Sequence, residues 1–418
     1  QIIYLLKFLE FINDHKPGRL ETFFTKDLFV YANVPYKIKP YQDLLKDPKD
    51  TIIFDEALDR KIREECSSFG ADGSLLRDEN RFIVKANFIE KILATTLAKL
   101  SNFIPEGGIW MNTQRPEWND ANNALVGNGV SMVTLYYLRR FFDFFEGLLT
   151  DTSVSEVEIS NEISEFFDAV LATLKKNKDL LSGTIKNQDK KSILDALGKA
   201  GSDYRIKIYT HAFSGRKTTL SMESLKNFIS LTKSYLEHSI EANKRSDNLY
   251  HAYNLMTVDS EDSVSISYLS EMLEGQVAVL SSGCLDGKET LNVLNALKQS
   301  ALFREDQFSY LLYPNKELKG FLDRNTIPEK AVSSSKLLLK MVQDGVVDII
   351  EKDINGAYHF NGNFKNANDV LSALEKLTET QYSSLLSSDT PKILQAFEEV
   401  FNHKAFTGRS GTFYGYEG

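Results

Sequence analysis

Apolar residues recur at helical spacing along most of the chain, and this periodicity limits the fold more than any other feature. In TLYYLRRFFDFFEGLL (134–149), apolar side chains lie three and four positions apart, with Arg139 and Arg140 between them. A second long segment begins at Ser221, where Ser221 and Glu223 form a helix start signal. Comparable segments cover residues 1–15, 84–104, 159–177, 264–283, 288–302, 329–345, 366–379 and 390–404. The sequence therefore predicts a mostly α-helical protein.

Strand signals are few and short. Residues 203–211 alternate like a strand, and residues 346–362 predict a hairpin whose turn contains Asn355-Gly356. Neither a sequence repeat of roughly 20–50 residues nor a linker rich in Pro, Gly and Ser divides the chain. We therefore expect a single helical catalytic-type domain over residues 1–418, with small β-hairpin insertions. A helical pattern at the first residues and an aromatic motif at the last suggest that this domain belongs to a longer chain.

The stretches between the predicted helices favour one helical architecture. Paired helices in this number form either an open superhelix or a closed toroid of helical hairpins. Three polar, aromatic stretches lie between or after helices: PEWNDANN (116–123), DNLYHAYNLM (247–256) and FTGRSGTFYGYEG (406–418). In a toroid, such loops gather at one rim of a rigid scaffold, where loops commonly carry function. We therefore expect the toroid.

Charge and composition exclude several classes of protein. The net charge is −9 and no long basic run exists, whereas a nucleic-acid-binding protein needs clustered Lys and Arg. The sequence also has no uninterrupted apolar run of about eighteen residues, which a membrane-spanning helix needs. We therefore expect neither nucleic acid nor a membrane as a partner.

The cysteines and histidines argue against a disulfide framework and a metal site. Cys66 and Cys284 are far apart in the sequence, and we expect two free buried thiols. The six histidines show no HxxxH or similar ligand spacing. We expect no metal and no other cofactor. Because free thiols suit a reducing compartment, we expect a cytoplasmic location.

The stretch RPEWNDANNALVG (115–127) is the best candidate for a catalytic loop. Burial beside Trp118 would raise the pKa of Asp120, so that this carboxyl could donate a proton near neutral pH, as cleavage of a glycosidic bond requires. Trp118 could stack on a sugar ring. The amides of Asn119, Asn122 and Asn123 could bind its hydroxyls. In the alternative interpretation, Asp120 caps the next helix and the asparagines shape a turn.

The order Trp118-Asn119-Asp120-x-x-Asn123, then a glycine-rich step and a long aromatic helix, resembles the acid loop of the inverting phosphorylases that include cellobiose phosphorylase. The resemblance covers residues 117–140. It implies that Asp120 is the general acid. It also implies that the domain is an (α/α)6 toroid, a fold that those enzymes share with glucoamylase-like and other inverting hydrolases.

The last residues of the chain leave two reactions open. The resemblance implies a phosphate site in a loop of small residues near the end of the domain. Such an anion cradle could be formed by Gly408, Arg409, Ser410, Gly411 and Thr412. Glu417 follows closely and would repel phosphate, but it could activate water as the general base of an inverting hydrolase. Arg409 would then pair with a carboxylate or bind a sugar hydroxyl. A tyrosine-rich packing corner is the alternative for Glu417.

Two further polar clusters could contribute to a sugar site. In the stretch 247–256, Tyr250 and His251 could line a subsite, or they could belong to a hydrogen-bonded core network. In the stretch 303–315, Glu305 and Asp306 are reserve candidates for the base.

These features lead us to predict an inverting glycoside hydrolase acting on an oligo- or polysaccharide, with Asp120 as acid and Glu417 as base. One alternative is an inverting glycoside phosphorylase that uses inorganic phosphate. The other is a non-catalytic helical scaffold or carbohydrate-binding protein. The enzyme interpretations require the stretches 115–123, 247–256 and 408–417 to converge.

Overall fold

The computed structural model describes residues 2–48, 50–112, 125, 127–150, 152–314 and 324–401. These residues form two compact units: unit 1 contains the described residues up to 314, and unit 2 contains residues 324–401. The structure is mostly helical with small sheets, which confirms this part of the sequence prediction. The sequence led us to expect one domain over residues 1–418. The helical periodicity continues on both sides of residue 315, so it gave no sign of the division into two units.

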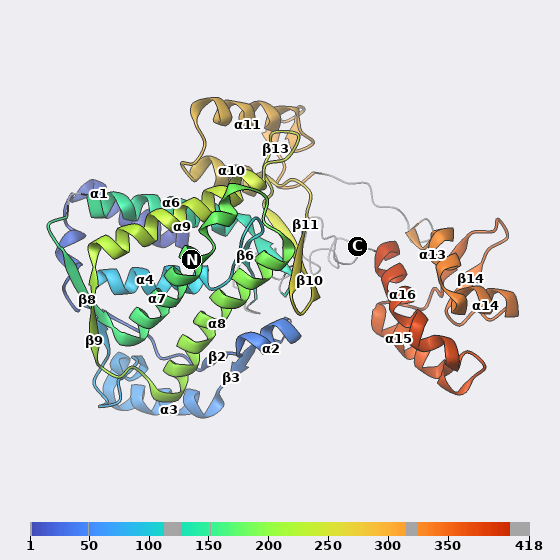
Figure 1. Ribbon diagram of the computed structural model, residues 1–418, viewed down its shortest axis with the longest axis horizontal. Coiled ribbons are helices and arrows are strands. Elements are labelled where there is room, and N and C mark those ends of the chain that lie inside the picture. The colour runs from blue at the N-terminus through green and yellow to red at the C-terminus, as the bar shows by residue number, and fades with distance from the viewer. Residues whose placement is uncertain are drawn as a thin grey trace. The chain divides into compact units, whose positions relative to one another are not determined.

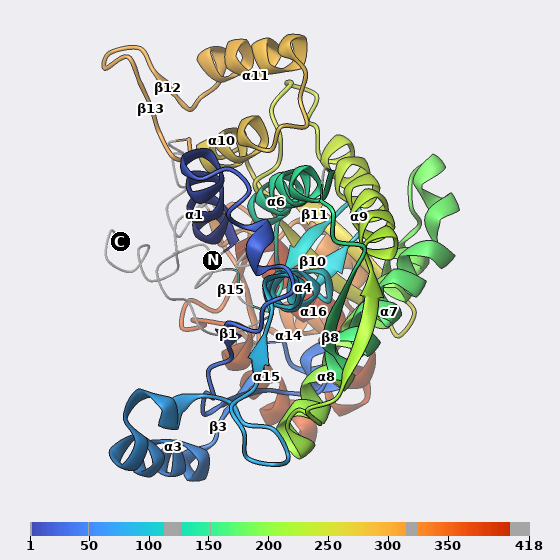
Figure 2. The same cartoon turned by 90° about the vertical axis from the view of Figure 1, so that its left-hand side faces the viewer.

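The helices of unit 1 carry most of its core. They are α1 (Ile2–His15), α2 (Tyr41–Lys46), α3 (Glu56–Phe69), α4 (Phe88–Leu100), α6 (Met132–Thr150), α7 (Asn161–Lys176), α8 (Asn187–His211), α9 (Met222–Ala242), α10 (Leu273–Ser281) and α11 (Gly287–Gln299). Short 3-10 turns lie at Glu21–Phe23, Gly70–Ser74 and Lys178–Ser182. As Figures 1 and 2 show, α6 packs against α1, α9 and α10, while α7 packs against α4 and α8. The segment with α11 projects from the rest of unit 1 in both views.

The aromatic residues of α6 explain why this helix lies at the centre of unit 1. Phe142 and Phe145 are completely buried. The ring of Phe142 meets that of Phe228 of α9 edge to face, with ring centroids 5.9 Å apart. The ring centroid of Phe167 of α7 lies 4.9 Å from that of Phe228. Burying an aromatic side chain contributes roughly 1.5–3 kcal/mol relative to leaving it exposed. The periodic pattern at residues 134–149 thus encodes the packing of three helices.

A sheet with the strand order β11-β10-β7-β6-β5 lies among these helices. All neighbouring strands in it are antiparallel. Its strands are β5 (Phe103–Ile104), β6 (Gly108–Trp110), β7 (Gly129–Ser131), β10 (Tyr253–Ser260) and β11 (Ser263–Tyr268). The other strands of unit 1 form pairs: β1 (Phe29–Val30) with β4 (Lys85–Ala86), β2 (Tyr36–Ile38) with β3 (Ile52–Phe54), β8 (Glu156–Ser160) with β9 (Lys217–Ser221), and β12 (Phe303–Arg304) with β13 (Ser309–Tyr310).

Three secondary-structure predictions are wrong. The stretch 247–256, expected as a loop between helices, enters strand β10 at Tyr253, because that strand pairs with β7 and β11. Residues 203–211, predicted as a strand, form the last turns of α8, because a helix begun at Asn187 continues through them. Residues 264–283, predicted as one helix, form β11 and then α10. Residues 263–268 form a strand because they pair with β10, and the local sequence pattern of these residues does not reveal that pairing.

Unit 2 has a hydrophobic core of its own. It consists of α13 (Glu329–Ser334), α14 (Lys336–Asp344), β14 (Ile350–Lys352), β15 (Tyr358–Phe360), α15 (Ala367–Glu375), a 3-10 turn (Lys376–Glu379) and α16 (Ser383–Phe401). Leu338, Phe360, Ile393 and Phe397 meet in its centre. The predicted hairpin around Asn355-Gly356 is confirmed as β14 and β15.

The buried carboxylate of Asp389, on α16, orders the start of α14. It accepts hydrogen bonds from Ser335 Oγ at 2.9 Å and from the backbone N–H of Leu337 at 2.8 Å. Ser335 is itself the N-cap of α14. A carboxylate at a helix N-terminus satisfies free N–H groups and interacts favourably with the helix dipole. Asp389 therefore links two helices of unit 2.

The structure also bears on the expectations for the two cysteines and for membrane-spanning helices. Cys66 and Cys284 are free, as expected, but both are partly exposed, so the expectation of buried thiols is wrong in that respect. Among the described residues, no helix combines the length and the apolar character needed to cross a membrane.

Candidate functional site

Most of the predicted site residues lie outside the described residues. These are Trp118, Asn119, Asp120, Asn122, Asn123, Arg409 and Glu417, together with the Gly408–Thr412 stretch. Their assignments stay predictions. The structure does describe Tyr250 and His251, and it describes both ends of the segment that contains Asp120.

The two ends of this segment are adjacent strands of the sheet. The chain leaves β6 at Trp110 and returns in β7 at Gly129, and the strands pair with Trp110 opposite Val130. Beyond that pair, the N–H of Met111 donates to the carbonyl of Gly129 at 2.9 Å, and the N–H of Gly127 donates to the carbonyl of Met111 at 3.2 Å. The segment that carries the predicted acid is therefore closed at its base by backbone hydrogen bonds.

Each end is also tied to a different part of unit 1. The side-chain amide of Asn112 donates to Asn102 Oδ1 at 2.6 Å on the outgoing side. On the returning side, the carbonyl of Asn128 accepts from the N–H of Met256 at 2.7 Å. Gly129 has no room for a side chain, because an added Cβ would lie 2.4 Å from Leu125 Cβ. The positions of both ends are thus fixed by packing as well as by hydrogen bonds.

The sheet brings the predicted subsite stretch 247–256 beside this base. Strand β10 pairs with β7, with Tyr253 opposite Ser131 and Leu255 opposite Gly129. The stretch therefore adjoins the returning end of the segment that contains Asp120. Residues 115–123 and 408–417 lie outside the described residues, so the convergence of the three stretches that the enzyme interpretations require stays a prediction.

Tyr250 and His251 occupy different surroundings. Tyr250 is completely buried, and burial, followed by the charges of Glu289 and Glu241, raises the pKa of its hydroxyl. Its backbone is held on both sides by Gln276, at 2.8 and 2.7 Å. Tyr250 is buried as a core residue is, but its hydroxyl has no hydrogen-bond partner among the described residues, so the alternative of a satisfied hydrogen-bonded network does not describe it.

His251 is held as a neutral ring. It stacks on Tyr268, with ring centroids 4.3 Å apart and planes inclined by 16°. Burial, and then the charge of Arg245, lowers the pKa of His251 to about 4. A neutral imidazole can donate and accept hydrogen bonds, but it has no proton to give as an acid at neutral pH.

The sequence interpretation missed Glu274, a carboxyl close to β10. The hydroxyl of Tyr253 donates to Glu274 Oε2 at 3.0 Å. Burial raises the pKa of Glu274, although the hydrogen bond from Tyr253 opposes this effect. We missed Glu274 because we predicted one helix over residues 264–283, which would place Glu274 in the middle of a helix. In the structure, strand β11 ends at Tyr268 and α10 begins at Leu273, so Glu274 lies in the first turn of α10.

Glu106 was also missed, and it holds the β5–β6 turn. Its carboxylate pairs with Lys190 Nζ at 2.8 Å, accepts from the N–H of Ile185 at 2.9 Å and lies 3.1 Å from His238 Nε2. Its carbonyl accepts from the side-chain amide of Asn243 at 2.8 Å. Burial raises the pKa of Glu106, but Lys190 and the Ile185 amide lower it more, so the pKa lies below its usual value.

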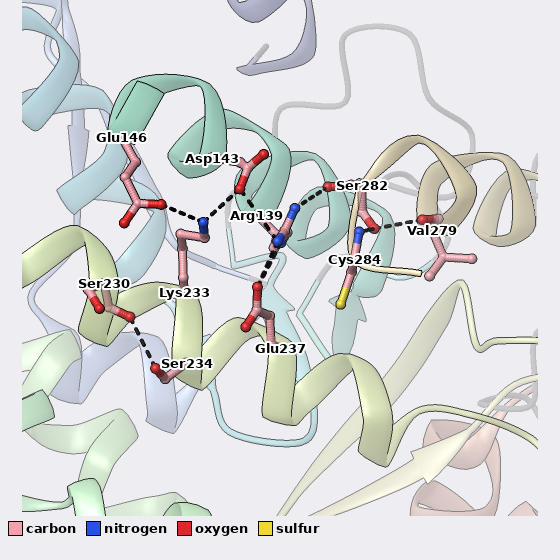
Figure 3. A network of polar contacts seen from close by, with 10 residues as sticks. All are labelled: Arg139, Asp143, Glu146, Ser230, Lys233, Ser234, Glu237, Val279, Ser282 and Cys284. Carbon is pink, nitrogen blue, oxygen red and sulfur yellow. Dashed lines mark hydrogen bonds and ion pairs between the residues drawn. The ribbon is translucent and has the colours of Figure 1, made fainter. Parts of the chain in front are cut away.

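A network around Arg139 fixes α6, the helix that follows β7 directly (Figure 3). Arg139 Nη2 donates to Glu237 of α9 at 2.8 Å, and Nη1 donates to the carbonyl of Ser282 at 3.0 Å. Lys233 of α9 bridges Asp143 and Glu146 of α6 at 2.6 and 2.7 Å. Because one guanidinium bonds to groups from two other elements, it ties α6 to α9 and to the end of α10.

Glu305 and Asp306, the reserve candidates for the base, take no part in the contacts described above. Glu305 and Asp306 are exposed in the turn between β12 and β13. Asp306 pairs with Arg304 at 2.6 Å, and this hydrogen bond lowers the pKa of the Asp306 carboxyl. A surface ion pair of this kind is common and does not indicate catalysis.

Comparison with known proteins adds information on unit 2. Residues 318–404 match a family model described as GH149 phosphorylase insertion domain 2. The match includes all of the described unit 2, so a separately packed unit coincides with a domain found in a phosphorylase family. No curated protein matches the chain.

Proposed function

We propose that this chain belongs to an inverting glycoside phosphorylase. The match of residues 318–404 to an insertion domain of a phosphorylase family carries the proposal, because it favours the phosphorylase alternative over the hydrolase. The resemblance of residues 117–140 to the acid loop of inverting phosphorylases supports the same reaction from a different part of the chain. The substrate would be an oligo- or polysaccharide.

In this proposal, Asp120 is the general acid. It protonates the glycosidic oxygen of the leaving sugar, while a phosphate oxygen attacks the anomeric carbon from the opposite face of the ring. The bond from the anomeric carbon to the leaving oxygen breaks as the bond to phosphate forms. The products are a sugar phosphate of inverted configuration and a saccharide shortened by one unit.

Phosphate takes the place of water, so no carboxylate base is required. We propose that Arg409 and the amides of the Gly408–Thr412 stretch bind phosphate, and Glu417 has no catalytic role in this reaction. Trp118, Asn119, Asn122 and Asn123 would bind the sugar. We further propose that unit 1 forms part of an (α/α)6 toroid. The packing of the consecutive helices α7 and α8 and the packing of α6 on α9 support that arrangement.

The test is to incubate the purified protein with a panel of oligosaccharides, with and without inorganic phosphate, and to measure free sugar and sugar phosphate. We expect sugar phosphate only when phosphate is present, and we expect Asp120→Asn to lower its formation by about 10²–10⁴-fold, since an amide cannot supply the proton. Release of free sugar without phosphate would contradict the proposal and support the hydrolase. Binding of a saccharide without any cleavage would support the non-catalytic alternative.

A further inference from the structure

The indole of Trp110 adds a side-chain contact to the base of the segment that contains Asp120. Its Nε1–H donates to the carbonyl of Gly127 at 2.8 Å. Trp110 lies on the outgoing side and Gly127 on the returning side, so this hydrogen bond joins the two ends. We call Trp110, Met111, Gly127 and Gly129, with the hydrogen bonds among them, the clasp.

The indole cannot turn away from this position without disturbing the core. Trp110 is only 2% exposed and packs in a hydrophobic cluster with Tyr41, Val130 and Leu194. Its donor is therefore aimed at the Gly127 carbonyl by packing and not by the hydrogen bond alone. A buried carbonyl that loses its donor is costly to leave unpaired, so the contact holds the Gly127 peptide in one orientation.

Gly127 itself is suited to this role. Its φ is +96°, in the left-handed region that favours glycine. The next residue, Asn128, bonds to β10 through its carbonyl. The peptide of Gly127 therefore directly precedes the residues that the sheet holds by hydrogen bonds. A change in the orientation of this peptide would change the direction in which the chain enters β7.

We propose that Trp110 is a positioning residue, which acts through the Gly127 carbonyl to fix the base of the segment that carries the general acid. The proposal rests on the proposed function of Asp120. Trp110 does not touch the substrate. Its contribution is geometric, because a shift of about 1 Å in a catalytic group can cost on the order of 10²-fold in rate.

The competing explanation is that Trp110 only fills the core, and two variants separate the explanations. Trp110→Phe keeps an aromatic ring in the cluster and removes the donor to Gly127. Tyr41→Phe is the matched control, since it also removes one hydrogen bond from the same cluster, the 2.6 Å contact with Asp195 Oδ1. It leaves the clasp intact.

The readouts are the steady-state constants for phosphorolysis, their pH dependence, and hydrogen exchange of peptides that cover 109–131. For Trp110→Phe, we expect kcat to fall about 10- to 100-fold with KM for phosphate changed less than about two-fold. We also expect a shifted basic limb of the kcat–pH profile and faster exchange at 127–131. Tyr41→Phe should change none of these.

Gly127→Ala is a further variant of the clasp, and it keeps the proposal testable if Trp110→Phe does not fold. Gly127→Ala leaves the indole in place but disfavours the backbone conformation of its partner, so it should reproduce the loss of kcat and the faster exchange. If either variant matches Tyr41→Phe in kcat and exchange, the positioning role is overturned while the proposed function stands. If the unmodified protein forms no sugar phosphate, the proposed function fails, and the exchange rates still decide whether Trp110 holds the clasp.

Discussion

Replacing Glu106 with Gln should destabilise unit 1 by about 3 kcal/mol or more. Glu106 and Lys190 are both nearly buried, and their charged groups are 2.8 Å apart. In Glu106→Gln, the side chain keeps its size and one oxygen for the Ile185 amide, but its new NH2 group has nothing to accept from Lys190. Breaking a buried ion pair by removing one partner costs about 3–5 kcal/mol, because the other charge stays buried without compensation.

The free energy of unfolding can be measured by urea denaturation with tryptophan fluorescence. The two tryptophans, at positions 110 and 118, precede residue 315, so the signal follows unit 1. Asp203→Asn is the matched control: Lys199 and Asp203 of α8 are also 2.8 Å apart, but their side chains are 70% and 61% exposed. We expect a cost below about 1 kcal/mol for this exposed pair.

A double-mutant cycle with Lys190→Met isolates the charge interaction. The double variant should be less destabilised than the sum of the single variants by about 1–3 kcal/mol, since it leaves no unpaired charge. A cost for Glu106→Gln as small as that of Asp203→Asn, or strict additivity in the cycle, would refute the reasoning.

The effect of Glu106 should also depend on pH. Its pKa is lower in the folded protein than the value of about 4.3 for an unfolded chain, so the unfolded chain takes up the proton first as the pH falls. The stabilisation is therefore fully present above about pH 5 and is lost as the pH falls through the folded-state pKa. The difference between the unmodified protein and Glu106→Gln should shrink over that range, and a difference that stays constant would contradict this account.

Three further predictions concern other parts of the chain. Burial lowers the pKa of His251 to about 4, so the unfolded chain binds the proton first below about pH 6.5, and stability should fall between these values; His251→Gln should flatten the fluorescence-detected decline, and an unchanged profile would contradict the burial argument. Asp389→Ala should destabilise α14 by about 1–3 kcal/mol, seen as faster hydrogen exchange in peptides over 336–344, whereas unchanged exchange would show that the carboxylate is dispensable. Arg139→Lys should lower the melting temperature by a few degrees, a cost of about 1–2 kcal/mol, because one ammonium nitrogen cannot occupy both positions from which Nη2 reaches Glu237 and Nη1 reaches Ser282. A melting temperature equal to that of the unmodified protein would show that the guanidinium geometry is unnecessary.

The sequence predicted those parts of the fold that local interactions determine. Ser221 caps α9 by accepting from the N–H of Ser224, at the start signal recognised in the sequence. The Asn355-Gly356 pair forms the turn of the β14–β15 hairpin, because Gly356 adopts a φ of +90°. In each case the signal and the structure lie within a few residues of one another.

The sheet could not be predicted in the same way. Strands β5, β6 and β7 contain two or three residues each, which is too short for an alternating pattern to appear. The sheet they belong to depends on the pairing of β7 with β10, which lies more than a hundred residues further along the chain. The buried ion pair of Glu106 with Lys190 likewise joins distant segments. For the candidate site, the placement of Asp120 beside the stretch 247–256 stays a prediction. Trp110 and Glu106 could not be identified from the sequence, because their partners Gly127 and Lys190 lie in other segments of the chain.

The strands and helices on both sides of the segment that contains Asp120 are anchored independently of that segment. Strand β7 is paired on both sides, by β6 and β10, so its backbone is fixed by the sheet itself. The β5–β6 turn is held by Glu106 on one side of this strand, and α6 is held by Arg139 on the other. A catalytic group must be placed accurately, yet asparagines and a carboxylate add little apolar burial with which to hold their own conformation. The elements on both sides of the segment have their own independent anchors, so in the proposed function its residues can serve binding and proton transfer without also having to hold the strands together.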